Sequence, residues 1–139
     1  MPDSRFGKAY DLYKKTLYEF ISNAFKWDET FQINRFQNKY QKEWFHDLRI
    51  NNKIIGYLCF YKTSFELHVS LLIIESEYRS HGYGKVIMNQ LKSDAIKEGL
   101  NMSLSSFKEN KSAIKFYTKL GFKIVKEDNI FIDMKLELN

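Results

Sequence analysis

A short segment with two glycines, residues 79–84, constrains the fold of this chain more than any other feature. Its sequence is Arg-Ser-His-Gly-Tyr-Gly, and it lies between a strongly apolar segment, residues 65–74, and an amphipathic one, residues 84–97. The apolar segment predicts a buried strand, and the amphipathic segment predicts a helix that Gly99 ends. A strand, a tight turn and a helix in this order indicate an α/β protein.

The turn itself has two interpretations. Glycines let the main chain approach a ligand closely, and the first turn of a helix presents unpaired N–H groups at the positive end of its dipole, so the turn can hold a diphosphate. Equally, glycines can relieve crowding in an ordinary connection, and short glycine motifs often match by chance. A Walker loop is excluded because Gly-Lys-Ser/Thr is absent from the sequence. A dinucleotide fold would need a third glycine and an acidic residue after the next strand, which here ends in Ser105-Ser106.

Hydrophobic periodicity predicts the remaining elements. Apolar residues recur every three or four positions from Ala9 to Ala24, and Asp28 can cap a second helix that carries Ile33, Phe36 and Tyr40 on one side. Strands are expected at residues 44–50, 53–61, 65–74, 102–106, 122–127 and 130–136, with a turn at Asn51-Asn52 that tolerates positive φ. The chain is predicted to be one domain, residues 1–139, with a mixed, mostly antiparallel sheet flanked by helices.

Composition narrows the classes of function. The single cysteine, Cys59, excludes an intrachain disulfide and suits a reducing cytoplasm, and its apolar surroundings predict a buried, inert thiol. Three scattered histidines add no standard zinc site, so no metal is expected. No apolar run approaches the roughly 20 residues of a membrane span, so we expect a cytoplasmic protein that does not enter the membrane. The net charge of +5 is spread over helix faces, which argues against nucleic acid but would favour an anionic cofactor.

A second segment, residues 110–122, changes the interpretation of the turn. Its sequence, Asn-Lys-Ser-Ala-Ile-Lys-Phe-Tyr-Thr-Lys-Leu-Gly-Phe, predicts an amphipathic helix with Asn110 as N-cap and Gly121 just beyond its end. Good caps explain this segment alone, but not its combination with the earlier Arg-x-x-Gly-x-Gly. The pair resembles the GNAT superfamily of acetyltransferases, which carries Gln/Arg-x-x-Gly-x-Gly/Ala before its central helix and Asn-x-x-Ala-x-x-Phe-Tyr-x-x-Leu-Gly-Phe roughly thirty residues later. The resemblance is dense over Phe65–Phe122.

The resemblance implies the GNAT fold and an N-acetyltransferase in which an amine attacks acetyl-CoA directly in a ternary complex. In the family a bulge splays the strand that ends near residue 74 from its neighbour, and the pantetheine arm lies in the gap. Tyr117 would protonate the departing thiolate, for which a phenol of ordinary pKa near ~10 is a reasonable donor, although a core aromatic would explain its place on the helix equally well. The residues implied for the cofactor are Leu72, Ile73, Ile74, Arg79, Ser80, His81, Gly82, Tyr83, Gly84, Lys85, Asn110 and Tyr117.

The catalytic base stays open at this stage. Glu66, His68 and Ser70 alternate on one face of a strand, and all three are candidates. The ordinary pKa of histidine, near ~6.5, suits a base, but a lone histidine on a strand is more often a surface or a hydrogen-bonded core residue.

The substrate region is equally open. Trp27-Asp28-Glu29-x-x-Gln resembles a segment of one bacterial GNAT subgroup, and its carboxylates would suit a cationic amine. Asp28 as a helix cap, Glu29 in the first turn, and Trp27 and Phe31 in the core would explain the same residues. A small-molecule or peptide amine is the expected substrate, and a homodimer or a non-catalytic CoA-binding module remain alternatives. The first strand usual in the family is not evident, because only Arg5-Phe6 could contribute to it.

Overall fold

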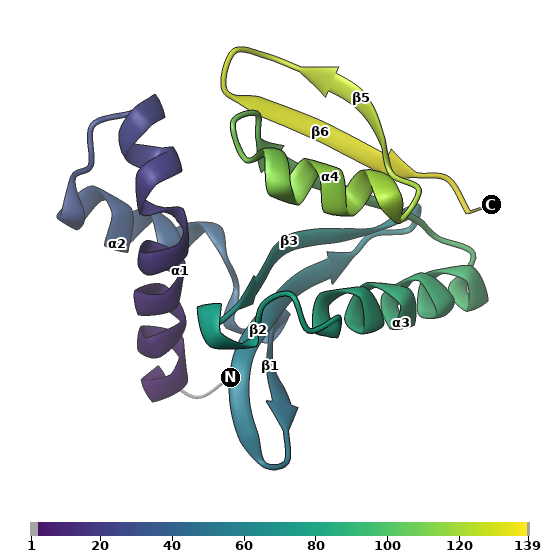
Figure 1. Cartoon of the computed structure of the whole chain (residues 1–139), viewed down its shortest axis with the longest axis horizontal. Helices are drawn as coiled ribbons and strands as arrows, with labels where there is room; N and C mark the ends of the chain where they lie inside the picture. Colours follow the sequence, from purple (N-terminus) through teal and green to yellow (C-terminus); the bar gives the residue numbers. More distant parts are fainter. Residues whose placement is uncertain (1–2, 139) are drawn as a thin grey trace. The chain divides into compact units, whose positions relative to one another are not determined.

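The computed structural model describes residues 3–138, which form four α-helices and six strands (Figure 1). The helices are α1 (Asp3–Ala24), α2 (Glu29–Lys39), α3 (Tyr83–Glu98) and α4 (Lys111–Lys119). The strands are β1 (Phe45–Ile50), β2 (Lys53–Lys62), β3 (Glu66–Ile74), β4 (Asn101–Phe107), β5 (Lys123–Glu127) and β6 (Phe131–Leu136), in the sheet order β1-β2-β3-β4-β6-β5. β3 and β4 are parallel, whereas β1–β2, β4–β6 and β5–β6 are antiparallel. The predicted mixed, mostly antiparallel sheet is confirmed.

The contacts divide the chain into two compact units. The first comprises the described residues up to 59 together with 71–78, and the second comprises 60–70 together with the described residues from 79 onward. β2 and β3 each contribute residues to both units, and each unit is described by itself below.

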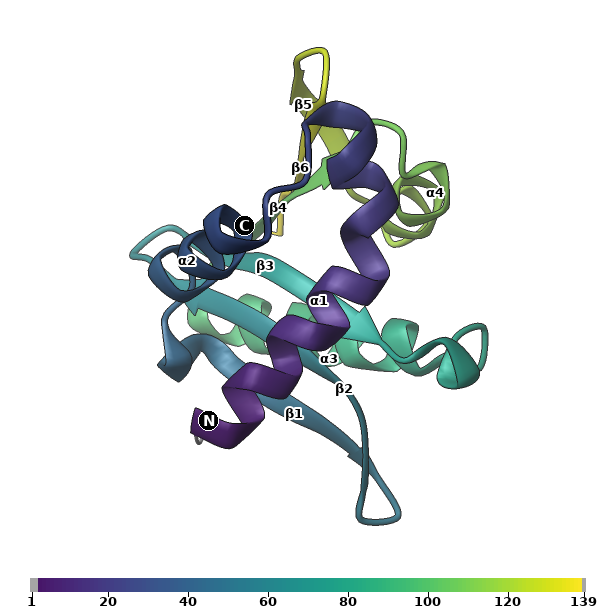
Figure 2. The same cartoon turned by 90° about the vertical axis from the view of Figure 1, so that its left-hand side faces the viewer.

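The first unit is built on an aromatic cluster between two helices and a hairpin. Figure 2 shows α1 crossing the face of β1 and β2, with α2 beside it. The Phe45 ring of β1 lies 5.1 Å from Phe6, 5.7 Å from Phe36 and 5.4 Å from Tyr57, and all four side chains are buried. The Tyr57 hydroxyl donates to the Ala9 carbonyl at 2.9 Å, so the buried phenol is satisfied.

In the second unit, α3 and α4 lie against strands that end in the β5–β6 hairpin. Met88, Leu91 and Ala95 form the buried face of α3, as their spacing predicts. Figure 1 shows α4 running alongside the β5–β6 hairpin. The parallel ladder joins Glu66–Val69 to Asn101–Leu104 and ends there, although β3 continues to Ile74 and β4 to Phe107.

Local signals fixed most element boundaries. Asp28 accepts a hydrogen bond from the Phe31 N–H at 3.0 Å and caps α2, and Asn51 and Asn52 adopt φ of 50° and 68° in the β1–β2 turn. Gly99 ends α3 with φ of 71°. Three details differ from expectation: the first helix begins at residue 3 rather than 9, Trp44 lies in a 3-10 turn before β1, and Phe31 is 58% exposed rather than in the core.

The family's usual first strand has no counterpart within residues 3–138, where the chain begins in α1. Arg5 and Phe6, which alone could have contributed to it, are helical. Arg5 instead forms an ion pair with Asp47 of β1 at 3.1 Å, and Phe6 packs in the aromatic cluster. Buried apolar side chains on one stripe therefore selected a helix at this end of the described chain.

Candidate acetyl-CoA and amine site

The turn before α3 has the conformation of a ligand-binding loop. Ser80 and Gly82 adopt left-handed φ values of 63° and 84°, and residues 79–82 are exposed. A serine in this region is uncommon and costs free energy, and such residues are found preferentially at functional sites. The positive φ of Ser80 could not be predicted from its residue type, because serine does not favour this part of backbone conformational space.

The start of α3 favours an anion. Gly82 is the N-cap and has no side chain with which to cap the first N–H groups of the helix. None of the described residues in the first turn of α3 is acidic, whereas Lys85 lies in that turn and Arg79 precedes it. The positive end of the helix dipole and these two cations therefore add up to positive charge at the exposed turn. A diphosphate, which is negatively charged, fits this arrangement.

Asn110 lies at the start of α4 and acts as its cap. Its Oδ1 accepts from the Ala113 N–H at 3.2 Å, and its own N–H donates to the Phe107 carbonyl at 3.0 Å. The side-chain oxygen is thus engaged in the helix, so a ligand would be met by the amide N–H₂ as a donor.

Tyr117 lies in the second half of α4, between the rings of Phe116 at 5.1 Å and Phe122 at 5.8 Å. Burial among these groups raises the pKa of Tyr117 to about 12. The sequence-based expectation of an ordinary pKa was therefore wrong. The phenol keeps its proton at any physiological pH and can donate it in a hydrogen bond.

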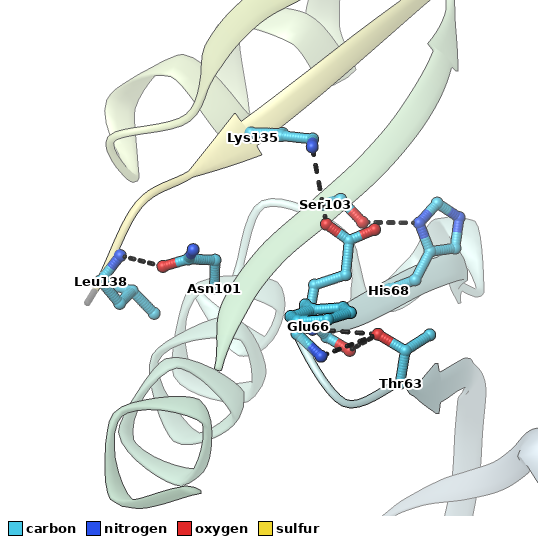
Figure 3. Close-up of polar contacts among 8 residues, drawn as sticks. Thr63, Glu66, His68, Asn101, Ser103, Lys135 and Leu138 are labelled. Carbon is cyan, nitrogen blue, oxygen red and sulfur yellow. Dashed lines mark hydrogen bonds and ion pairs between the residues drawn. The ribbon is translucent and has the colours of Figure 1, made fainter. Parts of the chain in front are cut away.

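Two of the three candidate bases lie in a polar row across β3, β4 and β6 (Figure 3). His68 Nδ1 is 2.8 Å from the hydroxyl of Ser103, the residue opposite it in the parallel ladder. Glu66 forms a 3.7 Å ion pair with Lys135. The Tyr61 ring lies 5.1 Å from the His68 ring. The partners Ser103 and Lys135 were missed by sequence reasoning, because only the strand register reveals them.

The end of β3 carries the residues expected to meet the pantetheine arm. The strand alternates strictly between buried and half-buried residues, so Ile73 is buried while Leu72 and Ile74 lie on the opposite, more open face. The main chain of Ile73 also approaches Gly56 of β2 very closely.

The segment expected to bind substrate is internally compensated. Asp28 is used as the cap of α2, and Glu29 Oε2 accepts from Trp27 Nε1 at 2.7 Å and pairs with Lys14 Nζ at 2.9 Å. The hydrogen bonds from Lys14 and then Trp27 lower the pKa of Glu29. Lys14 also lies 5.6 Å from the Trp27 ring centroid. The helix-cap interpretation of Asp28 is confirmed, and the charge of Glu29 already has a partner.

Other features of the described residues lie apart from these groups. An open groove of about 1060 Å³ in the first unit, lined by α1, α2 and the turn after α2, contains none of the predicted site residues. Its lining mixes acidic Asp11 and Glu43 with basic Lys8 and Lys42, so its charge selects no ligand. Within residues 3–138, no cluster of three or more His, Cys, Asp or Glu could hold a metal, and no helix is long and apolar enough to cross a membrane.

The predicted residues are divided between the two units. Residues 27–29 and 72–74 belong to the first, and residues 66, 68, 79–85, 110 and 117 belong to the second. Within the second unit, Glu66 and His68 lie in the first part of β3, residues 79–85 lead into α3, Asn110 caps α4 and Tyr117 lies in its second half.

Comparison with known proteins gives a family and a fold. The sequence model of the acetyltransferase (GNAT) family matches residues 7–122. The fold is similar to that of PaiA N-acetyltransferase from Thermoplasma acidophilum in complex with coenzyme A, with a TM-score of 0.76 at 18% identity over 97% of this chain and 91% of that one. It is similar to the ribosomal-protein-S18-alanine N-acetyltransferase from Escherichia coli, with a TM-score of 0.67 at 19% identity over 100% and 91%. A GNAT family acetyltransferase from Elizabethkingia anophelis with acetyl-CoA bound gives a TM-score of 0.61 at 17% identity over 68% and 75%.

Proposed function

Because this chain belongs to the GNAT family of acetyltransferases, we propose that it transfers the acetyl group of acetyl-CoA to a primary amine by direct attack in a ternary complex. The observation that carries the proposal is the exposed turn at residues 79–85. It combines two left-handed residues, an uncapped helix N-terminus and two cations with no acid in the first turn of α3. This is the chemistry that a diphosphate requires.

The remaining cofactor contacts follow from the family pattern residue by residue. The main chain of Leu72, Ile73 and Ile74 would pair with the pantetheine arm as an added strand does, and a backbone N–H there would polarise the thioester carbonyl. The Asn110 amide would donate to the pantetheine. The early end of the β3–β4 ladder supports this arrangement, because the β3 residues beyond Val69 are not used by that ladder.

Tyr117 would donate to the sulfur as the thiolate leaves. A thiol of ordinary pKa, about 8.5, is a stronger acid than a phenol with a pKa of about 12. Complete proton transfer is therefore uphill, and the main contribution of Tyr117 is a hydrogen bond to the developing negative charge.

For the base, contacts favour His68 over Glu66. The Glu66 carboxylate is paired with Lys135 at 3.7 Å, so it already has a partner within the second unit. Ser103 fixes the orientation of the His68 ring through Nδ1, so that Nε2 would take the proton from the attacking ammonium, directly or through water.

The acceptor amine would be chosen in part by residues 27–29. Because Lys14 already pairs with the exposed Glu29 carboxylate, a cationic substrate would compete with Lys14 for it. The similar structures include an enzyme named for a protein alanine, so both small-molecule and peptide amines belong in the search. The single, fully buried cysteine supports a cytoplasmic enzyme.

The test is a thiol-release assay with acetyl-CoA and separate panels of polyamines, amino acids, aminoglycosides and peptides. CoA release that depends on one class of amine is the expected result, with acetylated product confirmed by mass spectrometry. Tight acetyl-CoA binding without release on any panel would contradict catalysis and favour the non-catalytic CoA-binding module. Light scattering of the same preparation, with and without acetyl-CoA, decides whether the protein forms a homodimer.

A further inference from the structure

Gly56, in the middle of β2, lies where the main chain of β3 comes unusually close. A methyl group built on its Cα would overlap the Ile73 carbonyl oxygen and lie 2.9 Å from the Ile74 Cα and 3.0 Å from the Ile73 carbonyl carbon. Real Cβ atoms essentially never come nearer than 3.0 Å to such atoms. Every one of these atoms belongs to the main chain, so no side-chain rotation could relieve the overlap. Only glycine fits at this position.

The close approach indicates that β3 leaves a regular ladder at this point. In a regular sheet, side chains stand above and below the pleated plane, so a neighbouring main chain does not occupy the place of a Cβ. The Ile73 peptide does occupy that place at Gly56, beside a bulge of β2: Leu48 of β1 pairs with Gly56 and Arg49 pairs with Ile54, which leaves Ile55 as the extra residue. Pairing is present two residues later, where the Glu75 N–H donates to the Ile55 carbonyl at 2.8 Å. The irregular region therefore includes Ile55 and Gly56 of β2 as well as the main chain of Ile73 and Ile74.

The lack of space around its Cα, and not an unusual φ, explains why residue 56 is a glycine. The glycines with positive φ in the described chain are Gly82, Gly99 and Gly121. Gly56 is not among them, so an alanine could adopt its backbone conformation. The cost of an alanine would come from the overlap with Ile73 and Ile74 alone.

We propose that Gly56 is a positioning residue for the cofactor: by leaving room for the main chain of Ile73 and Ile74, it sets the course of the strand that meets the pantetheine arm. The inference rests on the proposed function, since that function gives Leu72–Ile74 their role. Gly56 touches no reacting atom itself. Filling its Cβ position would push the Ile73 peptide away from β2 and alter the edge offered to acetyl-CoA.

The chain contains a matched control. Gly7 lies in α1, and among the described residues no atom lies within 4 Å of the position that a Cβ would take there. Gly7→Ala is the same chemical change without an overlap, and it replaces a helix-interior glycine by the best helix former. It is expected to raise Tm and to leave CoA binding unchanged.

The experiment compares Gly56→Ala, Gly7→Ala and the double variant with the wild type. Calorimetric titration with CoA at about 10 °C gives the dissociation constant, thermal unfolding gives Tm, and circular dichroism gives the folded fraction. We expect Gly56→Ala to raise the CoA dissociation constant at least tenfold, corrected for the folded fraction. In the double variant the gain in Tm from Gly7→Ala should return without restoring CoA affinity.

The outcomes separate the inference from the function on which it rests. Wild-type affinity in folded Gly56→Ala, with only Tm lowered, would make the glycine structural and overturn the inference while the proposed function stands. A double variant that is unfolded at about 10 °C would overturn the inference as well, because Gly56 would then support the unit and not one edge. A wild-type protein that does not bind CoA would overturn both.

Discussion

Replacing Tyr117 by phenylalanine removes one hydroxyl and leaves the ring that packs against Phe116 and Phe122. The expected consequence is a lower kcat with little change in acetyl-CoA affinity, because the hydroxyl interacts with sulfur mainly when negative charge develops there. If kcat and kcat/KM fall together by the same factor, the lost interaction belongs to the transition state.

The magnitude follows from the pKa of the phenol. A pKa of about 12 lies about 3.5 above that of an ordinary thiol, so complete proton transfer costs roughly 5 kcal/mol before the site adjusts either group. A hydrogen bond to a charged group contributes about 1.5–3 kcal/mol, or roughly 10- to 150-fold in rate. A full general acid would contribute ~10²–10⁴-fold. The rate contributions of a hydrogen bond and of a general acid overlap at about 10²-fold. Because the raised pKa disfavours complete proton transfer, we expect Tyr117→Phe to lower kcat by about 10²-fold.

The assay is thiol release at saturating acetyl-CoA and amine, repeated from pH 6 to pH 10. Tyr40→Phe is the control, because it removes the hydroxyl of a buried tyrosine that belongs to no proposed site. Since Tyr117 stays protonated below about pH 12, its replacement should lower the whole pH profile without changing the shape. A kcat within threefold of wild type would refute the role. An alkaline limb that disappears in Tyr117→Phe would refute the pKa argument.

Three further perturbations test other groups. His68→Gln should lower kcat/KM by about 10²-fold and remove the acidic limb of the pH profile, whereas Glu66→Gln should leave that limb in place; the reverse pattern would assign the base to Glu66. Gln32→Met should raise the free energy of unfolding in urea by about 1 kcal/mol, because the buried Gln32 Oε1 has no hydrogen-bond partner among the described residues. A decrease would mean that Gln32 makes a stabilising hydrogen bond in the folded protein. Burial raises the pKa of Tyr40 and Tyr57 in the folded state above the unfolded value near ~10. The free energy of unfolding should therefore hold its full value below pH ~10 and fall as the pH rises beyond it. A free energy of unfolding that stays flat from pH 9 to pH 11.5 would contradict this.

The parts of the fold that the sequence predicts well are those set by neighbours along the chain. Asp28 and Asn110 were expected as helix caps, and the side chain of each accepts a hydrogen bond from the backbone N–H three residues later. Capping depends on a few consecutive residues, so residue type and spacing suffice to predict it. The same holds for Asn51-Asn52, whose left-handed conformation is a property of the turn itself.

The contacts that define the candidate site depend on register, which is a long-range property. Ser103 is opposite His68 only because the parallel ladder pairs Glu66 with Asn101, and a shift by one residue would bring Met102 or Leu104 there instead. Lys14 and Glu29 meet because α1 and α2 pack together, so neither residue predicts the pair by itself. The sequence therefore placed the candidate bases on one strand and favoured His68 over Glu66, but it could not predict the partners of either.

Tyr117 shows why residue type alone does not predict the chemistry of a proposed catalytic group. The family pattern depends on residue type at one position, whereas the pKa depends on every atom that excludes water from the phenol. A solvated tyrosine near its ordinary pKa would be a plausible source of a whole proton for a thiolate, but one with a pKa of about 12 stabilises the thiolate mainly while it keeps its proton. The proton that finally neutralises CoA can then come from solvent after release. In the proposed mechanism, stabilisation of the leaving sulfur and its protonation are therefore two separate steps.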